Sequence, residues 1–353
     1  MRHDVKRIPD RSGRGDSHAP VAVVTGASAG IGRATAVEFA RRGFDVALLA
    51  RGRAGLEGAR RDVEAAGGRA LVLPADVADA GAVLAAAGEV VARWGRIDVW
   101  VNNAMATVVG PVVDTSLAEF RRVTEVTYLG AVHGTLAALA HMRPRDAGTI
   151  VQVGSALAYR AIPLQSAYCG AKFAVRGFTD ALRTELLHDG SAVRLTMVQL
   201  PGVNTPQFDW SRTSMPYRHQ PVGACYQPEA VARSIVDAAE QAPRELWVGI
   251  PAIQAILATM LAPGLMDRYL ASAAYEDQLS AKPVPPGDHG ILFGPASEDH
   301  GARGRFGARA KTSLTNADPA LLRGGIALAA LGAVAGAFLL GSHKRTEGER
   351  LRR

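Results

Sequence analysis

The chain of 353 residues is predicted to be an α/β protein with a doubly wound parallel sheet. Between residues 21 and 250, short and almost continuous apolar segments alternate with segments of helical length. Strands that are covered by helices on both faces of a parallel sheet have this pattern. A glycine-rich turn at residues 25–32 follows the first apolar segment and opens the first helical one, as in the first unit of such a sheet.

Seven strands are expected in this region, and each is a short apolar segment. They begin at Val21, Asp45, Ala70, Ile97, Gly148, Arg194 and Glu245. The helical segments between them include residues 30–42, 80–94, 116–142, 166–187 and 228–241. Because strand and helix alternate with short connections, residues 21–250 are expected to form one domain.

The segments outside this domain differ from it in composition. We expect a disordered basic tail (1–20), a helical extension (251–280) with a break at Pro263 and Gly264, a linker or loosely packed extension (281–320), a transmembrane or membrane-dipping helix (321–342) and a basic tail (343–353). The extension at 281–320 is rich in Gly, Pro, Arg and Asp and has no period that would form a core.

Composition argues against several classes of function. The net charge is +7, but the arginines are spread thinly and no nucleic-acid-binding motif accompanies them, so no nucleic-acid partner is expected. Cys169 and Cys225 lack metal spacing and fit a reduced, cytosolic compartment. No metal site is expected, since His133, His141 and His188 have no ligand-like neighbours in sequence.

The glycine turn predicts a nucleotide site. Gly26, Gly30 and Gly32 let the backbone turn tightly and approach a pyrophosphate, whose charge is favoured at a helix N-terminus. At the end of the second strand, Ala50 stands where an acidic residue would bind an adenosine ribose, and Arg51 follows. A guanidinium can hold a 2′-phosphate, so we expect NADP(H) in preference to NAD(H), which stays the alternative.

A second group of residues predicts acid–base chemistry. Tyr168 and Lys172 are four residues apart and therefore share one face of a helix. An unperturbed tyrosine titrates near pH 10, and a nearby cation would lower that pKa toward the working range. Ser155, at the end of a strand, could hold the substrate oxygen. Taken singly, these residues could equally be an exposed helix pair and a turn former.

The joint occurrence of these motifs resembles the classical short-chain dehydrogenase/reductase family, whose fold is a Rossmann fold, over residues 21–250. The turn TGASAGIG includes Ser28 and Ile31, and the spacing of Ser155 and Tyr168 is the family's usual one. The resemblance implies further cofactor contacts at Asp76, Val77, Asn103, Ala104, Pro201, Gly202, Val203 and Thr205, and at Tyr168 and Lys172 themselves.

The resemblance also implies the roles of the catalytic residues. Tyr168 would exchange the proton, Lys172 would lower its pKa and hold the nicotinamide ribose, and Ser155 would bind the carbonyl oxygen. Thr127 stands where the family has an asparagine that supports a water relay behind the lysine, so relay through Thr127 is open. Homo-oligomers through helices 116–142 and 166–187 are implied by the resemblance as well.

The sequence leaves the substrate open. Residues 204–228, where the family places its variable lid, are rich in aromatic and apolar side chains, which favours a hydrophobic carbonyl or alcohol, unless these side chains only pack the lid. The expected function is therefore an NADP-preferring oxidoreductase. The rival is a scaffold or redox sensor that binds NADP(H) without significant turnover.

An apolar segment near the C-terminus, residues 324–341, contains no charge. As a helix it would reach about 27 Å, close to the roughly 30 Å of a hydrocarbon core. We expect it to span or dip into a membrane, with the catalytic domain in the cytoplasm. The alternative is a soluble helix that docks on the enzyme or on a partner subunit.

Overall fold

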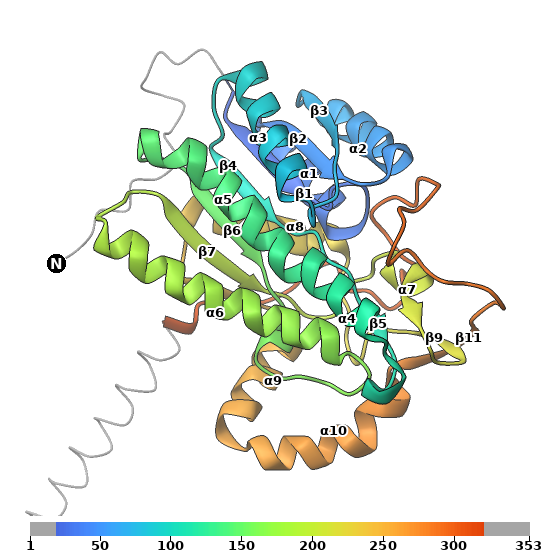
Figure 1. The fold of residues 1–353 in the computed structure, drawn as a ribbon. Coiled ribbons are helices and arrows are strands. Elements are labelled where there is room, and N and C mark those ends of the chain that lie inside the picture. Colours follow the sequence, from blue (N-terminus) through green and yellow to red (C-terminus); the bar gives the residue numbers. More distant parts are fainter. Residues whose placement is uncertain (1–18, 321–353) are drawn as a thin grey trace, which may run out of the picture.

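The computed structural model describes residues 19–320, and its centre is an eight-stranded sheet (Figure 1). Seven of the strands are parallel and correspond to the seven that the sequence predicts. Their bounds are β1 Val21–Thr25, β2 Asp45–Ala50, β3 Ala70–Pro74, β4 Val99–Asn102, β6 Thr149–Val153, β7 Arg194–Gln199 and β10 Glu245–Val248. The doubly wound Rossmann-type sheet is thereby confirmed.

The strands lie in the order β3-β2-β1-β4-β6-β7-β10, and β12 (Asn316–Ala317) adds an antiparallel strand beside β10. The direction of winding reverses between β1 and β4. In open α/β sheets a ligand crevice forms at this switch point, beyond the carboxyl ends of the strands. The topology therefore predicts a ligand site between β1 and β4, beyond the carboxyl ends of these strands.

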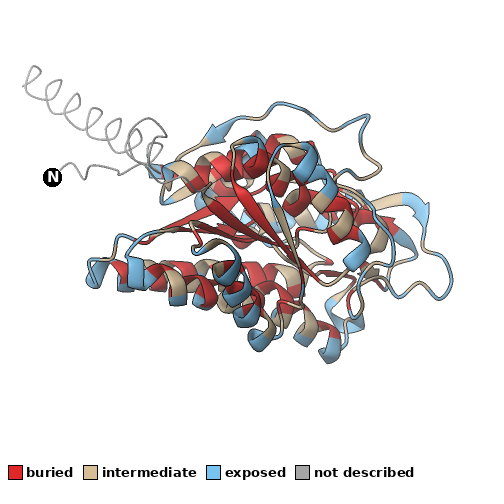
Figure 2. Ribbon diagram, turned by 90° about the horizontal axis from the view of Figure 1, so that it is seen from above, coloured by how far each residue is buried: buried red, intermediate tan, exposed pale blue. Residues whose placement is uncertain are grey.

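Helices cover both faces of the sheet (Figure 2). One buried cluster joins the sheet to α1 (Gly30–Arg41), α2 (Arg53–Ala65) and α8 (Pro228–Gln241). A second joins the other face to α3 (Ala80–Trp94), α5 (Gly130–Met142) and α6 (Ser166–His188). The strands have apolar side chains on both faces because both faces are covered.

The helix expected at residues 116–142 is divided in the structure. α4 (Leu117–Thr124) begins with a capping box between Ser116 and Glu119, and α5 follows after a π-helical segment, η2 (Glu125–Leu129). Single π turns inside helices are a recurrent feature of functional sites. This one contains Thr127, the residue expected to replace the relay asparagine.

After β10 the chain forms two helices, α9 (Ile250–Leu261) and α10 (Pro263–Asp277), and the break predicted at Pro263 and Gly264 falls at the start of the second. The next segment, residues 282–318, is called the C-terminal arm below. The sequence predicts a linker or loosely packed extension here; most of its side chains are exposed or half-buried, but it makes specific contacts with the domain. The arm is the orange-red chain that returns past α7 (Gln207–Trp210) to α2 and the nucleotide turn (Figure 1), and then contributes β12 to the sheet.

Small strands complete the described chain. β5 (Val108–Val109) pairs with β8 (Arg212–Thr213), and β9 (Tyr217–His219) pairs with β11 (Leu279–Pro283). Within residues 19–320, no helix is long and apolar enough to cross a membrane. The segments predicted as a membrane helix and basic tail, and nearly all of the N-terminal tail, lie outside the described residues.

Candidate active site

The glycine turn between β1 and α1 is closely packed against the end of β4. A Cβ added to Gly26 would lie 2.9 Å from the Cα of Ala104, and one on Gly32 would overlap the carbonyl oxygen of Gly26. Gly26 and Gly30 also have positive φ angles of 68° and 59°. These positions require glycine, and they bring the chain into a tight turn at the N-terminus of α1, where the N–H of Gly30 donates to the carbonyl oxygen of Gly301.

Thr25 fixes the turn relative to β4. Its Oγ1 donates to the carbonyl oxygen of Val101 and accepts from the backbone N–H groups of Asn103 (2.9 Å) and Ala104 (3.0 Å). The side-chain amide of Asn103 donates to the carbonyl oxygen of Thr25 at 2.9 Å. Asn103 and Ala104, which the resemblance marks as cofactor contacts, therefore pack directly on the glycine turn.

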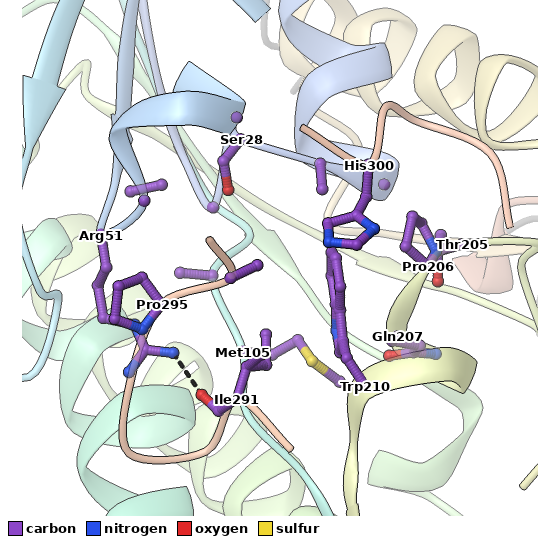
Figure 3. Close-up of a pocket in the computed structure, with 18 of the residues that line it drawn as sticks. Ser28, Arg51, Met105, Thr205, Pro206, Gln207, Trp210, Ile291, Pro295 and His300 are labelled. Carbon is purple, nitrogen blue, oxygen red and sulfur yellow. Dashed lines mark hydrogen bonds between the residues drawn. The ribbon is translucent and has the colours of Figure 1, made fainter. Parts of the chain in front are cut away.

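A cavity that is partly open to solvent lies at the switch point (Figure 3). Ten of the predicted cofactor residues line it: Gly26, Ser28, Gly30, Ile31, Arg51, Asp76, Val77, Asn103, Ala104 and Thr205. The lining fits a dinucleotide, because glycines of the turn lie along it beside the start of α1 and arginine and polar side chains lie farther along it. Gly32, Pro201, Gly202 and Val203 lie outside the lining and shape the turn and the loop after β7.

Arg51 lies at the edge of this cavity and is already engaged. Its two terminal nitrogens donate to the carbonyl oxygens of Ile291 (2.7 Å) and Leu292 (3.3 Å), both in the C-terminal arm (Figure 3). Arg122 also donates to the Leu292 carbonyl oxygen, at 3.2 Å, and forms an ion pair with Asp76. Two arginines and one aspartate thus surround the place predicted for the adenosine end of a cofactor.

Ser155, Tyr168 and Lys172 come together at the carboxyl end of β6. Ser155 is 8% exposed and caps a short 3₁₀ turn, accepting from the N–H of Leu157 at 3.1 Å. Tyr168 and Lys172 lie on α6, with the ammonium 5.6 Å from the centre of the phenol ring. Lys172 is 3% exposed and donates to the carbonyl oxygen of Val153 at 2.7 Å. None of the three lines the cavity itself.

Burial shifts the pKa values of both Tyr168 and Lys172. Burial raises the pKa of Tyr168 above its ordinary value, and a hydrogen bond with Ser155 only partly opposes this. Burial also lowers the pKa of Lys172 to about 8. Desolvation is the largest cause of the raised pKa of Tyr168, and Lys172 is not among its causes, so the role expected of Lys172 stays a prediction.

Thr127 is buried and has a different partner from the one expected for a relay. Its Oγ1 accepts from the N–H of Ala106 (2.9 Å) and donates to the carbonyl oxygen of the same residue (3.0 Å). The hydroxyl therefore fixes the loop after β4 to the π turn. Participation in a proton relay stays a prediction.

Sequence reasoning missed a polar chain behind Ser155. The N–H of Ser155 donates to Oε1 of Gln199 at 2.8 Å, and Nε2 of Gln199 donates to Glu245 at 2.7 Å. Glu245 in turn accepts from the hydroxyl of Tyr159 at 2.7 Å. Gln199 is fully buried in β7. A long polar side chain at the end of a buried strand is the signal that could have pointed to it.

The C-terminal arm was also missed as part of the site. Five of its residues line the cavity: Ile291, Pro295, Ala296, Glu298 and His300. The ring of His300 lies 4.8 Å from that of Trp210, edge to face, on the cavity wall (Figure 3). Trp210 belongs to α7, within the segment predicted as the substrate lid.

Comparison with known proteins defines the class. The family model for short chain dehydrogenases matches residues 20–215. The oxidoreductase YxnA of Bacillus subtilis is 32% identical over 77% of this chain and 77% of its own. Mouse dehydrogenase/reductase SDR family member 7B is 32% identical over 74% of this chain and 83% of its own.

Two solved structures of similar proteins indicate the same class of protein. An alcohol dehydrogenase from Thermococcus sibiricus, complexed with 5-hydroxy-NADP, is 28% identical, with a TM-score of 0.56 over 65% of this chain and 96% of its own. A metagenomic short-chain oxidoreductase in complex with NADP is 29% identical, with a TM-score of 0.54 over 64% of this chain and 92% of its own. The chain belongs to the short-chain dehydrogenase/reductase family and is an oxidoreductase of that class.

Proposed function

We propose that this protein interconverts a carbonyl and an alcohol on a hydrophobic small molecule, with NADP(H) as the preferred cofactor. The observation that carries the proposal is the grouping of Ser155, Tyr168 and Lys172 at the same sheet edge as the glycine-lined cavity. An acid and a cation on α6 and a hydroxyl beside the carboxyl end of β6 can act on one substrate oxygen.

When bound, a reduced nicotinamide supplies the hydride for the carbonyl carbon. Tyr168 then donates its proton to the oxygen, on which Ser155 stabilises the developing charge. A raised pKa keeps the phenol protonated before the transfer, which suits a donor. Lys172, with a pKa of about 8, is mostly charged at neutral pH and stabilises the phenolate that the transfer leaves behind.

The preference for NADP(H) rests on Arg51 and its surroundings. Ala50 offers no carboxylate that would repel a 2′-phosphate, and Arg51 and Arg122 provide two guanidinium groups near the adenosine end. Asp76 neutralises part of this charge through its ion pair with Arg122. Two structural neighbours are complexes with NADP or a derivative of it, which agrees with the preference.

A hydrophobic substrate is supported by the side chains of the lid. Trp210 and Met105 line the cavity, and Phe208 is buried beside it against Phe306 of the arm. Membrane association through residues 324–341 and a homo-oligomeric state are proposed from the sequence alone.

The experiment that tests the function compares the wild-type protein with Tyr168→Phe. Oxidation of NADPH by the wild type with hydrophobic aldehydes or ketones, lost in the variant while NADPH still binds, supports the proposal. Tight binding without turnover in the wild type, over a broad panel, would favour the scaffold or redox sensor.

A further inference from the structure

The C-terminal arm lies outside the part of the chain that the family model matches, yet it is built into the nucleotide site. Its first connection is to the glycine turn. The carbonyl oxygen of Gly301 accepts from the N–H of Gly30 at 3.1 Å. Two residues earlier, Asp299 forms an ion pair with Arg33, which lies on the first turn of α1 and is 6% exposed.

The second connection is at the opposite end of the cavity. The carbonyl oxygens of Ile291 and Leu292 hold the guanidinium of Arg51, as described above. The side chain of Leu292 is 2% exposed and packs in a cluster with Ala167 and Ala171 of α6, the helix that carries Tyr168. The arm is therefore anchored next to both predicted reactive regions.

A third group of contacts fixes the arm beyond the cavity. The N–H of Phe306 donates to Oδ1 of the fully buried Asn204 at 2.8 Å. Arg305 donates to the carbonyl oxygen of Phe208 at 2.7 Å and to Asp209 at 2.6 Å. Since Asn204 and Phe208 belong to the loop after β7, the arm and this loop are held as one unit.

These contacts leave the space beneath the arm open. Ser28 of the glycine turn and Ile291, Pro295 and His300 of the arm all line the cavity (Figure 3). If the arm filled the nucleotide site, no cavity would remain there. Instead, residues of the arm form part of the cavity lining, as a cover would. Arg51 also has donor hydrogens beyond the two that the arm occupies, because a guanidinium carries five.

We propose that the C-terminal arm is a wall of the cofactor site, held closed by the Arg33–Asp299 ion pair, and that the Ile291 and Leu292 carbonyls position Arg51 for a 2′-phosphate. This inference rests on the proposed use of NADP(H). The arm then retains bound cofactor, because the cofactor leaves only when the arm opens. Asp299 and Leu292 are positioning residues and do not take part in the chemistry.

The test measures release of NADPH from the full-length protein by stopped-flow fluorescence after mixing with excess NADP⁺. In Asp299→Asn we expect about tenfold faster release and a similar rise in Kd, as for loss of a partly buried charge-assisted pair. Asp189→Asn is the matched control, because Asp189 pairs with Arg143 on the surface at 2.8 Å, and it should leave both constants unchanged.

Tighter binding or faster association in Asp299→Asn would show that the arm competes with the cofactor and would overturn the proposal. Unchanged constants would overturn it too. No binding of NADPH to the wild type would instead remove the proposed function on which the inference rests.

A second measurement needs no variant. Hydrogen exchange of wild-type residues 291–301 should slow on addition of NADP⁺, and less so with NAD⁺ at equal occupancy, because Arg51 links the arm to the 2′-phosphate. Faster exchange on binding would mean that the arm is displaced and would contradict a wall.

Discussion

The burial of Lys172 has a clear consequence for how the free energy of unfolding depends on pH. Burial lowers its pKa from 10.5 to about 8, so between these two values the unfolded chain binds more protons than the folded one. The free energy of unfolding should therefore rise with pH in this window, by about 3 kcal/mol in total at the ordinary worth of a pKa shift. Below pH 8 the full cost of burying the charge is present.

Urea unfolding of the wild type and of Lys172→Met at pH 7, 8, 9 and 10 checks this prediction. Taking the difference between the two proteins cancels the titration of all other groups. The wild type should gain stability relative to the variant as the pH rises. Parallel curves would show that Lys172 has an ordinary pKa in the folded protein.

Gln199 is expected to act through Ser155. Replacing it with Leu removes the acceptor of the Ser155 N–H and one donor to Glu245, and should lower kcat by about ten- to a hundredfold. Because Gln199 does not line the cavity, the Kd for NADPH should not change.

The matched control for Gln199→Leu is Gln152→Leu. Gln152 is equally buried, in β6, but its amide donates to Thr135 at 2.9 Å, away from Ser155. This variant should lose stability and keep kcat. An equal loss of kcat in both variants would mean that Gln199 has a general structural role only.

At the scale of elements, the glycine turn makes a steric prediction. In Gly32→Ala the new Cβ would overlap the carbonyl oxygen of Gly26, so the turn must shift. We expect a loss of about 2 kcal/mol or more in stability, as for overpacking, and a clear rise in the Kd for NADPH. Thermal unfolding and fluorescence titration measure the two effects.

Gly88→Ala provides the comparison, since Gly88 lies exposed in the middle of α3 and a Cβ there meets nothing within 4 Å. It should stabilise the protein by about 1 kcal/mol through helix propensity, with unchanged binding. Normal NADPH binding by Gly32→Ala would show that the cofactor does not approach this turn.

The sequence predicts some elements much better than others, for physical reasons. The parallel strands are apolar on both faces, so they can be read directly from β1 to β10. The π turn at Glu125–Leu129 cannot be predicted from the sequence, because it differs from an α-helix in its backbone hydrogen bonds and not in a recognisable pattern of residues.

The residues of the candidate site also differ in how well the sequence predicts them. Tyr168 and Lys172 act through their side chains, and the glycines act by having none. Residue type and spacing in the sequence are therefore enough to predict these positions. The arm binds Gly30, Arg51 and Arg122 mainly through its own carbonyl oxygens, which every sequence has. Gln199 is recognisable only once Ser155 is placed beside it.

At the scale of the whole molecule, the arm changes how the domains are divided. The segment expected to be a linker joins the sheet through β12 and lines the cavity, so the candidate site draws on residues on both sides of β10. The contacts described for the site all lie within residues 19–320, and the apolar segment 324–341 follows them in the sequence.

This arrangement gives a test of the membrane proposal. Detergent-free fractionation should find the full chain with membranes and a chain ending at residue 320 in the supernatant, with equal turnover in both. Recovery of the full chain in the supernatant would contradict membrane association and favour a helix that docks on protein.

The central claim is that Tyr168 gives its proton to a substrate in a cofactor-dependent reduction. The most direct measurement is NADPH and NADH oxidation by the purified full chain with a panel of hydrophobic carbonyls, beside Tyr168→Phe. We predict turnover that prefers NADPH and falls by about a thousandfold or more in the variant, at the scale of a lost general acid, with unchanged NADPH binding. Equal turnover by the variant would contradict the account.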